Sequence, residues 1–172
     1  MNTLLKRHLA STQSGDLYYT PSYATELIVP YLRGTIWECA AGEGHVTTVL
    51  ESHKLTVIES DIAWGIDFLS SNLPINNIDF IVTNPPYKLK DKFLEHCYKL
   101  GKPFALLLPL TTLGGMKRTK MYNEYGLEIL IPDRRINFIY KGAGKACWFH
   151  SAWFCHNVLP EKLMFAEIEN RD

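Results

Sequence analysis

The stretch that decides the fold lies in the middle of the chain and reads Asp79-Phe80-Ile81-Val82-Thr83-Asn84-Pro85-Pro86-Tyr87. Its first part is a β-branched and aromatic run, which predicts a short buried strand. The two prolines end that strand, because neither can donate a hydrogen bond to a neighbouring strand. Pro85 also favours an extended backbone at Asn84, so we expect the asparagine side chain at the carboxyl end of the strand. In an open α/β sheet, ligands bind at that edge.

This polar corner suits chemistry on an amino group that is conjugated to a ring or to a carbonyl. Such a nitrogen is a poor nucleophile because its lone pair is delocalised. The amide oxygen of Asn84 and the carbonyl of a proline, for which we choose Pro85, can each accept one N–H. The nitrogen then becomes more tetrahedral, with its lone pair directed at an electrophile, while Tyr87 stacks on a planar substrate. The alternative is a rigid strand-to-loop turn without chemistry.

The tetrapeptide Asn84-Pro85-Pro86-Tyr87 resembles the catalytic motif of the class I S-adenosylmethionine-dependent amino methyltransferases, above all of the DNA adenine-N6 enzymes. The resemblance implies a Rossmann-like α/β fold, in which helices flank a mainly parallel sheet. It implies S-adenosylmethionine as the cofactor. It also implies that these four residues form the catalytic corner, with Asn84 contacting the cofactor as well.

The length of 172 residues predicts one domain with a core of its own. We expect a loose arm at 1–18 and a single methyltransferase domain at 19–172, without a separate target-recognition domain. No apolar run has the length of a membrane span, and no signal-peptide core follows the amino terminus. The four cysteines show no disulfide-framework spacing, so we expect reduced thiols in a cytoplasmic protein, in the host cytoplasm if a phage encodes it.

The charges sum to zero but are unevenly distributed along the chain. Residues 1–87 carry a net charge of −5, residues 88–145 carry +7, and residues 146–172 carry −2. A basic segment directly after the catalytic corner favours a polyanionic substrate, which we expect to be DNA, with RNA as the alternative. A solvated lysine-rich helix face accounts nearly as well for the first part of this segment. The substrate-binding candidates are Tyr87, Lys117, Arg118, Arg134 and Arg135.

Two stretches before the catalytic corner resemble cofactor-binding motifs. Tyr19-Thr20-Pro21 is similar to the triplet that, in many adenine methyltransferases, closes over the methionine end of the cofactor. Thr20 or Ser22 could cap the helix that follows, Pro21 suits its first position, and residues 27–32 would give it an apolar face.

The second of these stretches covers residues 35–45, where an apolar strand runs into small residues and two glycines. A helix is expected over 46–53, and its amino terminus offers free N–H groups. The stretch lacks the third glycine of the dinucleotide fingerprint and resembles the methyltransferase cofactor loop instead. That resemblance implies cofactor contacts from Glu38, at the methionine part, and from Ala40, Gly42 and Gly44. An ordinary strand-to-helix turn is the alternative.

The next strand is expected over 55–59, and a carboxylate at its end would accept hydrogen bonds from both ribose hydroxyls. Glu59 and Asp61 compete for this role, and the resemblance, which continues through the neighbours of Asp61, favours Asp61. The pair Asp67 and Phe68 is similar to one that contacts the adenine amino group and ring in related enzymes. For Phe68, a plain core position is nearly as good an interpretation.

The remaining pattern predicts a helix over 88–100 that stops at Gly101, a strand buried on both faces over 103–110, and a loop and helix over 111–126. Further strands are expected at 127–131, 135–140, 146–156 and 163–168. We predict no metal site, because the candidate ligands lie along one strand whose alternate residues face opposite sides. These candidates are Cys147, His150, Cys155 and His156.

The resemblance extends over 19–154, and the late segment looks like that of compact phage-type adenine methyltransferases. It implies methyl transfer to the exocyclic N6 of an adenine that is flipped out or unpaired. Three alternatives remain: an RNA amino methyltransferase, a protein glutamine-N5 methyltransferase, and a non-catalytic subunit that binds cofactor or nucleic acid. The glutamine-N5 family usually carries an additional amino-terminal helical domain and needs no basic surface.

Overall fold

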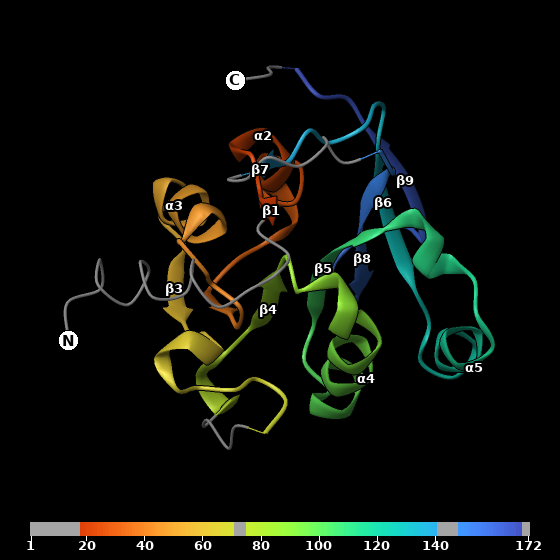
Figure 1. Cartoon of the computed structure of the whole chain (residues 1–172), viewed down its shortest axis with the longest axis horizontal. Helices are drawn as coiled ribbons and strands as arrows, with labels where there is room; N and C mark the ends of the chain where they lie inside the picture. The colour runs from red at the N-terminus through yellow and green to blue at the C-terminus, as the bar shows by residue number, and fades with distance from the viewer. Residues whose placement is uncertain (1–17, 71–74, 141–147, 170–172) are drawn as a thin grey trace.

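A seven-stranded sheet forms the centre of the computed structural model, which describes residues 18–70, 75–140 and 148–169 (Figure 1). The strand order is β3-β2-β4-β5-β8-β6-β9. The strands span β2 Thr35–Glu38, β3 Thr56–Glu59, β4 Phe80–Thr83, β5 Phe104–Pro109, β6 Glu128–Pro132, β8 Ser151–His156 and β9 Leu163–Ala166.

The sheet is parallel except for one strand. Strands β3, β2, β4 and β5 pair in parallel, as do β6 and β9, whereas β8 is antiparallel to both of its neighbours. The sheet is therefore a Rossmann-like, mainly parallel α/β sheet flanked by helices, and this predicted architecture is confirmed. From β2 the chain moves outward to β3 and then returns to the other side of β2 as β4. This change of direction is a topological switch point, where open α/β sheets bind ligands.

In the described parts of the chain, four α-helices cover the two faces of the sheet (Figure 1). Side chains of α2 and α3 pack on one face, and side chains of α4 and α5 pack on the other. Helices α3, α4 and α5 each connect two parallel strands. The helices span α2 Ser22–Glu26, α3 His45–Ser52, α4 Lys90–Leu100 and α5 Met116–Tyr125.

Each face of the sheet has its own hydrophobic core because successive strand residues point to opposite sides. In β5, Ala105 and Leu107 belong to the first core, whereas Phe104, Leu106 and Leu108 belong to the second. All of these are fully buried, as the continuous apolar run predicts.

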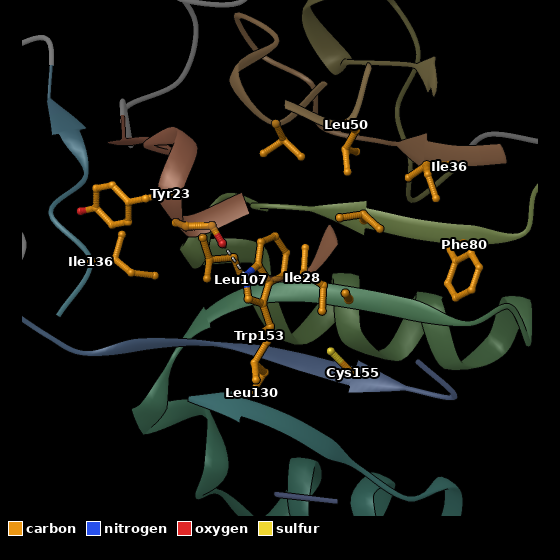
Figure 2. Packing of buried hydrophobic residues seen from close by; sticks show 14 of the residues in the cluster. Tyr23, Ile28, Ile36, Leu50, Phe80, Leu107, Leu130, Ile136, Trp153 and Cys155 are labelled. Carbon is orange, nitrogen blue, oxygen red and sulfur yellow. Dashed lines mark hydrogen bonds between the residues drawn. The ribbon is translucent and has the colours of Figure 1, made fainter. Parts of the chain in front are cut away.

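One side chain connects helix α2 to the sheet. Trp153 of β8 lies in the first core with Ile28, Leu107 and Leu130 (Figure 2). Its indole N–H donates to the Ala24 carbonyl of α2 at 2.8 Å. This bond helps to hold α2 against the face of the sheet.

A separate two-stranded sheet pairs β1 Tyr18–Tyr19 with β7 Ile139–Tyr140. The expected strand over 135–140 is therefore wrong for all but its last two residues. Ile136 and Phe138 do alternate inward, at 0% and 8% exposure. However, the Asn137 N–H between them donates to the Tyr23 hydroxyl at 2.8 Å instead of to a strand. The predicted arm lies outside the described residues except for Tyr18, which is paired.

The helix expected after the Tyr-Thr-Pro triplet is shorter than predicted. It ends at Glu26, and a 3₁₀ turn follows over Val29–Tyr31. Pro30 explains the break, because it lacks an N–H and disfavours helical backbone at the residue before it. Pro21 lies just before the first helical residue, and no side chain caps the helix. The predicted capping role of Thr20 or Ser22 is thus wrong.

The other predicted elements differ mainly at their ends. A 3₁₀ turn over Tyr87–Leu89 precedes α4, and α4 ends at Gly101, whose φ of 65° is the left-handed value expected there. The first described residue of the last part of the chain is Trp148, so the start of the strand expected at 146 lies outside the described residues. Within the described parts of the chain, no helix is long and apolar enough to cross a membrane.

Candidate functional site

A cavity of about 330 Å³ opens at the carboxyl ends of β2 and β4, at the switch point of the sheet. Its walls come from β1, the glycine loop after β2, the turn after β3 and the corner after β4. The volume falls in the usual range for small-molecule sites. The sequence-predicted site residues that line it are Tyr19, Thr20, Glu38, Ala40, Gly42, Asp61, Asp67, Phe68, Asn84, Pro85, Pro86 and Tyr87. Pro21 and Gly44 adjoin lining residues but do not line it themselves.

The glycine loop is fastened to the turn after β3 by a carboxylate. Gly42 has a φ of 53°, and its N–H donates to Asp61 Oδ2 at 2.9 Å. The other oxygen of Asp61 accepts from the Ala63 N–H at 2.8 Å. Each oxygen keeps a second lone pair for a ligand. Of the two carboxylates that compete for the ribose role, Asp61 lines the cavity and Glu59 does not.

Glu38 places a buried acid in the wall of the cavity. Its side chain is 1% exposed, and Oε1 accepts from the Ala40 N–H at 3.1 Å. Burial raises its pKa to about 8, and the nearby Thr83 hydroxyl and the Ala40 N–H offset this rise only in part. Near neutral pH the carboxyl of the ligand-free protein is therefore mostly protonated. A cation in the cavity would favour its charged form.

The amide of Asn84 is held in one orientation. Its Nδ2 donates to the Thr20 hydroxyl at 3.0 Å and to the Tyr18 carbonyl at 3.4 Å. Its Oδ1 is buried and has no hydrogen-bond partner among the described residues. The Pro86 carbonyl accepts from the Leu89 N–H at 2.8 Å, so the Pro85 carbonyl is the better candidate for a second acceptor. The corner thus holds a buried acceptor without a described partner, in a residue that lines the cavity.

Tyr87 lies in an aromatic cluster formed with Tyr18, Phe138 and Phe149. The ring of Tyr18 is stacked on it at 6.4 Å between centroids. Phe138 and Phe149 meet it edge-on at 6.2 Å and 5.5 Å. Three segments that are distant in the sequence therefore contribute aromatic rings that hold Tyr87 in place.

The predicted adenine pair has a mixed role. Asp67 accepts from the Leu69 N–H and the Ser70 hydroxyl, both at 3.0 Å, and so forms a tight turn. Phe68 is 2% exposed and stacks on Phe93 at 4.9 Å. It is thus a core residue that also contributes to the cavity wall, so both interpretations of Phe68 apply.

Sequence reasoning missed ten of the lining residues, and Glu43, His45 and Ile62 are the most informative of them. The Tyr19 hydroxyl donates to Glu43 Oε1 at 3.0 Å, and His45 Nε2 lies 3.7 Å from Glu43 Oε2. The rings of Tyr19 and His45 are 4.8 Å apart. Burial, followed by the bond to Glu43, raises the pKa of Tyr19 to about 12. These contacts join the arm to the glycine loop. Ile62 lines the cavity while 66% exposed, and its place directly after Asp61 was the available signal.

The predicted basic contacts lie outside the cavity. Arg118 pairs with Asp91 at 2.7 Å, and Arg134 pairs with its neighbour Asp133 at 2.9 Å. Within the described ranges, Lys117 and Arg135 have no such ion pair. In those ranges no three His, Cys, Asp or Glu side chains gather as a metal site requires, and Cys147 lies outside them.

Comparisons with known proteins add little to this geometry. No family model and no curated protein matches the chain. Among solved structures, it is similar to a protein from Agrobacterium tumefaciens described as a predicted O-methyltransferase, with a TM-score of 0.42 and 16% sequence identity. That match covers 97% of this chain and 85% of the other. A likeness this distant says nothing about chemistry.

Proposed function

We propose that the chain is an S-adenosylmethionine-dependent methyltransferase that acts on the N6 amino group of adenine in DNA. The observation that carries the proposal is the buried Oδ1 of Asn84, which has no partner among the described residues. Leaving such an acceptor unpaired costs stability. A substrate N–H would satisfy it, and the resemblance of the corner to the amino methyltransferase motif names the donor as an aromatic amine.

The residues of the cavity fit the cofactor. S-adenosylmethionine, when bound, supplies a methyl group on a positively charged sulfur, along with an ammonium group, a ribose and an adenine. Glu38 offers a buried carboxyl that a cation would ionise, and Asp61 offers lone pairs to ribose hydroxyls. Ile62 and Phe68 offer apolar surface to a purine ring.

The chain contributes mainly orientation to the reaction. Asn84 Oδ1 and the Pro85 carbonyl would each accept one N–H of the target amine, which turns its lone pair toward the methyl carbon. Tyr87 would stack against the target base. The two acceptors would hold the nitrogen in line with the methyl group that the bound cofactor would supply, with the electrons of the broken bond left on the cofactor's sulfur. The surplus proton on the nitrogen would then leave to solvent. Holding the reacting atoms in line accounts for a large part of such rate enhancements.

The substrate class follows from charge. Residues 88–145, which begin directly after the corner, carry a net charge of +7, and a polyanion favours such a segment. A glutamine side chain in a protein would also fit the two acceptors, but it would gain nothing from this charge. DNA is preferred over RNA on the resemblance of the motifs alone.

A methyl-transfer assay tests the proposal. Purified protein is incubated with methyl-labelled S-adenosylmethionine and single-stranded oligonucleotides with or without adenine, and with RNA and protein pools. Label should enter the adenine-containing DNA. Asn84→Ala should lower the rate by roughly 100-fold or more while leaving cofactor affinity nearly unchanged, because the contact orients the reacting amine. Asn77, exposed and outside the cavity, provides the matched control Asn77→Ala.

Two results would contradict the proposal. Full turnover by Asn84→Ala would show that the corner is only a rigid turn. Label in RNA or protein, and none in DNA, would support methyltransferase activity and contradict DNA as the substrate.

A further inference from the structure

An exposed tryptophan lies near the catalytic corner without a role in the proposed reaction. Trp148 is 82% exposed, whereas Trp37 and Trp153 are at most 1% exposed. Trp148 does not line the cavity, so the cofactor and the target base leave it unused.

Ring contacts connect this tryptophan to the corner. Trp148 meets Phe149 edge-on at 6.2 Å between centroids, and Phe149 meets Tyr87 at 5.5 Å. Tyr87 is itself three residues from Asn84 along the chain. Two ring-to-ring steps thus lead from solvent to the residue that would stack on the target base. Phe165, the other exposed aromatic ring used for comparison below, makes no ring contact with this series among the described residues.

A cation accompanies the exposed ring. Arg135 Nη1 donates to the Trp148 carbonyl at 3.4 Å. The acidic side chain nearest to it in sequence, Asp133, is paired with Arg134 instead. Across the described residues, no carboxylate forms an ion pair with Arg135, so its charge stays available next to the Trp148 backbone. An exposed aromatic face next to an available guanidinium is the combination that binds a base and its phosphate in single-stranded nucleic acids.

We propose that Trp148 and Arg135 form a stacking platform for an unpaired nucleotide that adjoins the target base in single-stranded DNA. The inference rests on the proposed function, since it assumes that a nucleobase reaches Tyr87. Trp148 stacks on the neighbouring base and Arg135 contacts its phosphate. Because every base has an aromatic face, the platform tolerates different sequences. It would supply part of the affinity for the substrate.

Fluorescence provides a test that does not depend on methyl transfer. A short single-stranded oligonucleotide should quench the emission of Trp148, because Trp37 and Trp153 are buried. Trp64 is half-buried, so the quenching that Trp148→Ala removes measures the share of Trp148. Anisotropy of a labelled oligonucleotide then measures affinity. Trp148→Ala should raise Kd by about 5- to 100-fold and remove most of the quenching, whereas Trp148→Phe should keep most of the affinity. Arg135→Gln should reduce the salt dependence of log K by about one unit.

The matched control is Phe165→Ala on β9, which removes an aromatic side chain that is 71% exposed. It should bind within twofold of the unaltered chain. If Trp148→Ala also binds within twofold, or if Phe165→Ala loses as much affinity, the platform is refuted.

The assay also separates this inference from the function on which it rests. With saturating oligonucleotide, Trp148→Ala should keep its kcat and show a raised KM. The platform alone is refuted if the unaltered chain methylates DNA and Trp148→Ala has the same Kd and KM as the unaltered chain. Quenching that depends on Trp148 without methyl transfer to any DNA would support the platform and refute the proposed reaction.

Discussion

Replacing the buried acid of the cavity should change how stability depends on pH. Glu38 is 1% exposed, and burial raises its pKa from 4.5 to about 8. Glutamine has nearly the same shape as the protonated acid and keeps an oxygen for the Ala40 N–H. Glu38→Gln therefore removes the ionisation while leaving the packing of the site in place.

The sign and size follow from linkage between protonation and folding. The unfolded chain releases the Glu38 proton near pH 4.5, whereas the native chain holds it until about pH 8. Between these values the unfolded state binds fewer protons, so the free energy of unfolding falls as pH rises. The slope from this group is about 1.4 kcal/mol per pH unit. Between pH 4.5 and pH 8, the free energy of unfolding of the unaltered chain should fall by about 5 kcal/mol relative to that of Glu38→Gln.

Urea unfolding at pH 5, 6, 7 and 8 measures this difference directly. The free energy of unfolding of Glu38→Gln should exceed that of the unaltered chain by a larger amount at each higher pH. Glu51→Gln on the exposed side of α3 is the control, and its curve should stay within about 0.5 kcal/mol of the unaltered chain at every pH. A constant gap between Glu38→Gln and the unaltered chain would refute the assignment of a protonated acid to this site.

Two further predictions concern cofactor affinity, measured by calorimetry. Asp61→Ala should weaken S-adenosylmethionine binding more than tenfold through the loss of charge-assisted hydrogen bonds. Glu59 lies outside the cavity, so Glu59→Ala should change the affinity less than twofold. The opposite result would assign the ribose contact to Glu59. Tyr19→Phe removes the donor to Glu43, so it should weaken cofactor binding a few-fold and lower the free energy of unfolding by about 1 kcal/mol. Tyr31→Phe is the control outside the cavity. Unchanged affinity in Tyr19→Phe would show that the contact between Tyr19 and Glu43 is irrelevant to the cofactor.

The sequence predicted the elements that local chemistry determines. The run before Asn84 becomes β4 because its β-branched and aromatic residues fill both cores, and the two prolines end it where expected. Gly101 ends α4 because the left-handed backbone there favours glycine. The order of these elements then brings the ends of β2 and β4 together at the switch point, and that edge carries the cavity.

What the sequence missed depends on contacts between distant segments. Ile136 and Phe138 alternate as strand residues do, yet the backbone between them pairs with the hydroxyl of Tyr23, more than a hundred positions away. The pairing of Arg118 with Asp91, 27 positions earlier, could not be predicted from the sequence for the same reason. It shows that a count of basic residues overstates the charge available to a polyanion.

Two of the costs built into this chain lie in residues that line one cavity. An acid is buried in its neutral form at Glu38, and the Asn84 oxygen is buried without a partner among the described residues. Each of these lowers stability in the absence of a ligand. A rigid turn would explain the two prolines, but it would not require either cost. That both occur on the wall of one cavity, at the switch point of the sheet, is what a site shaped for a cation and an amino group requires.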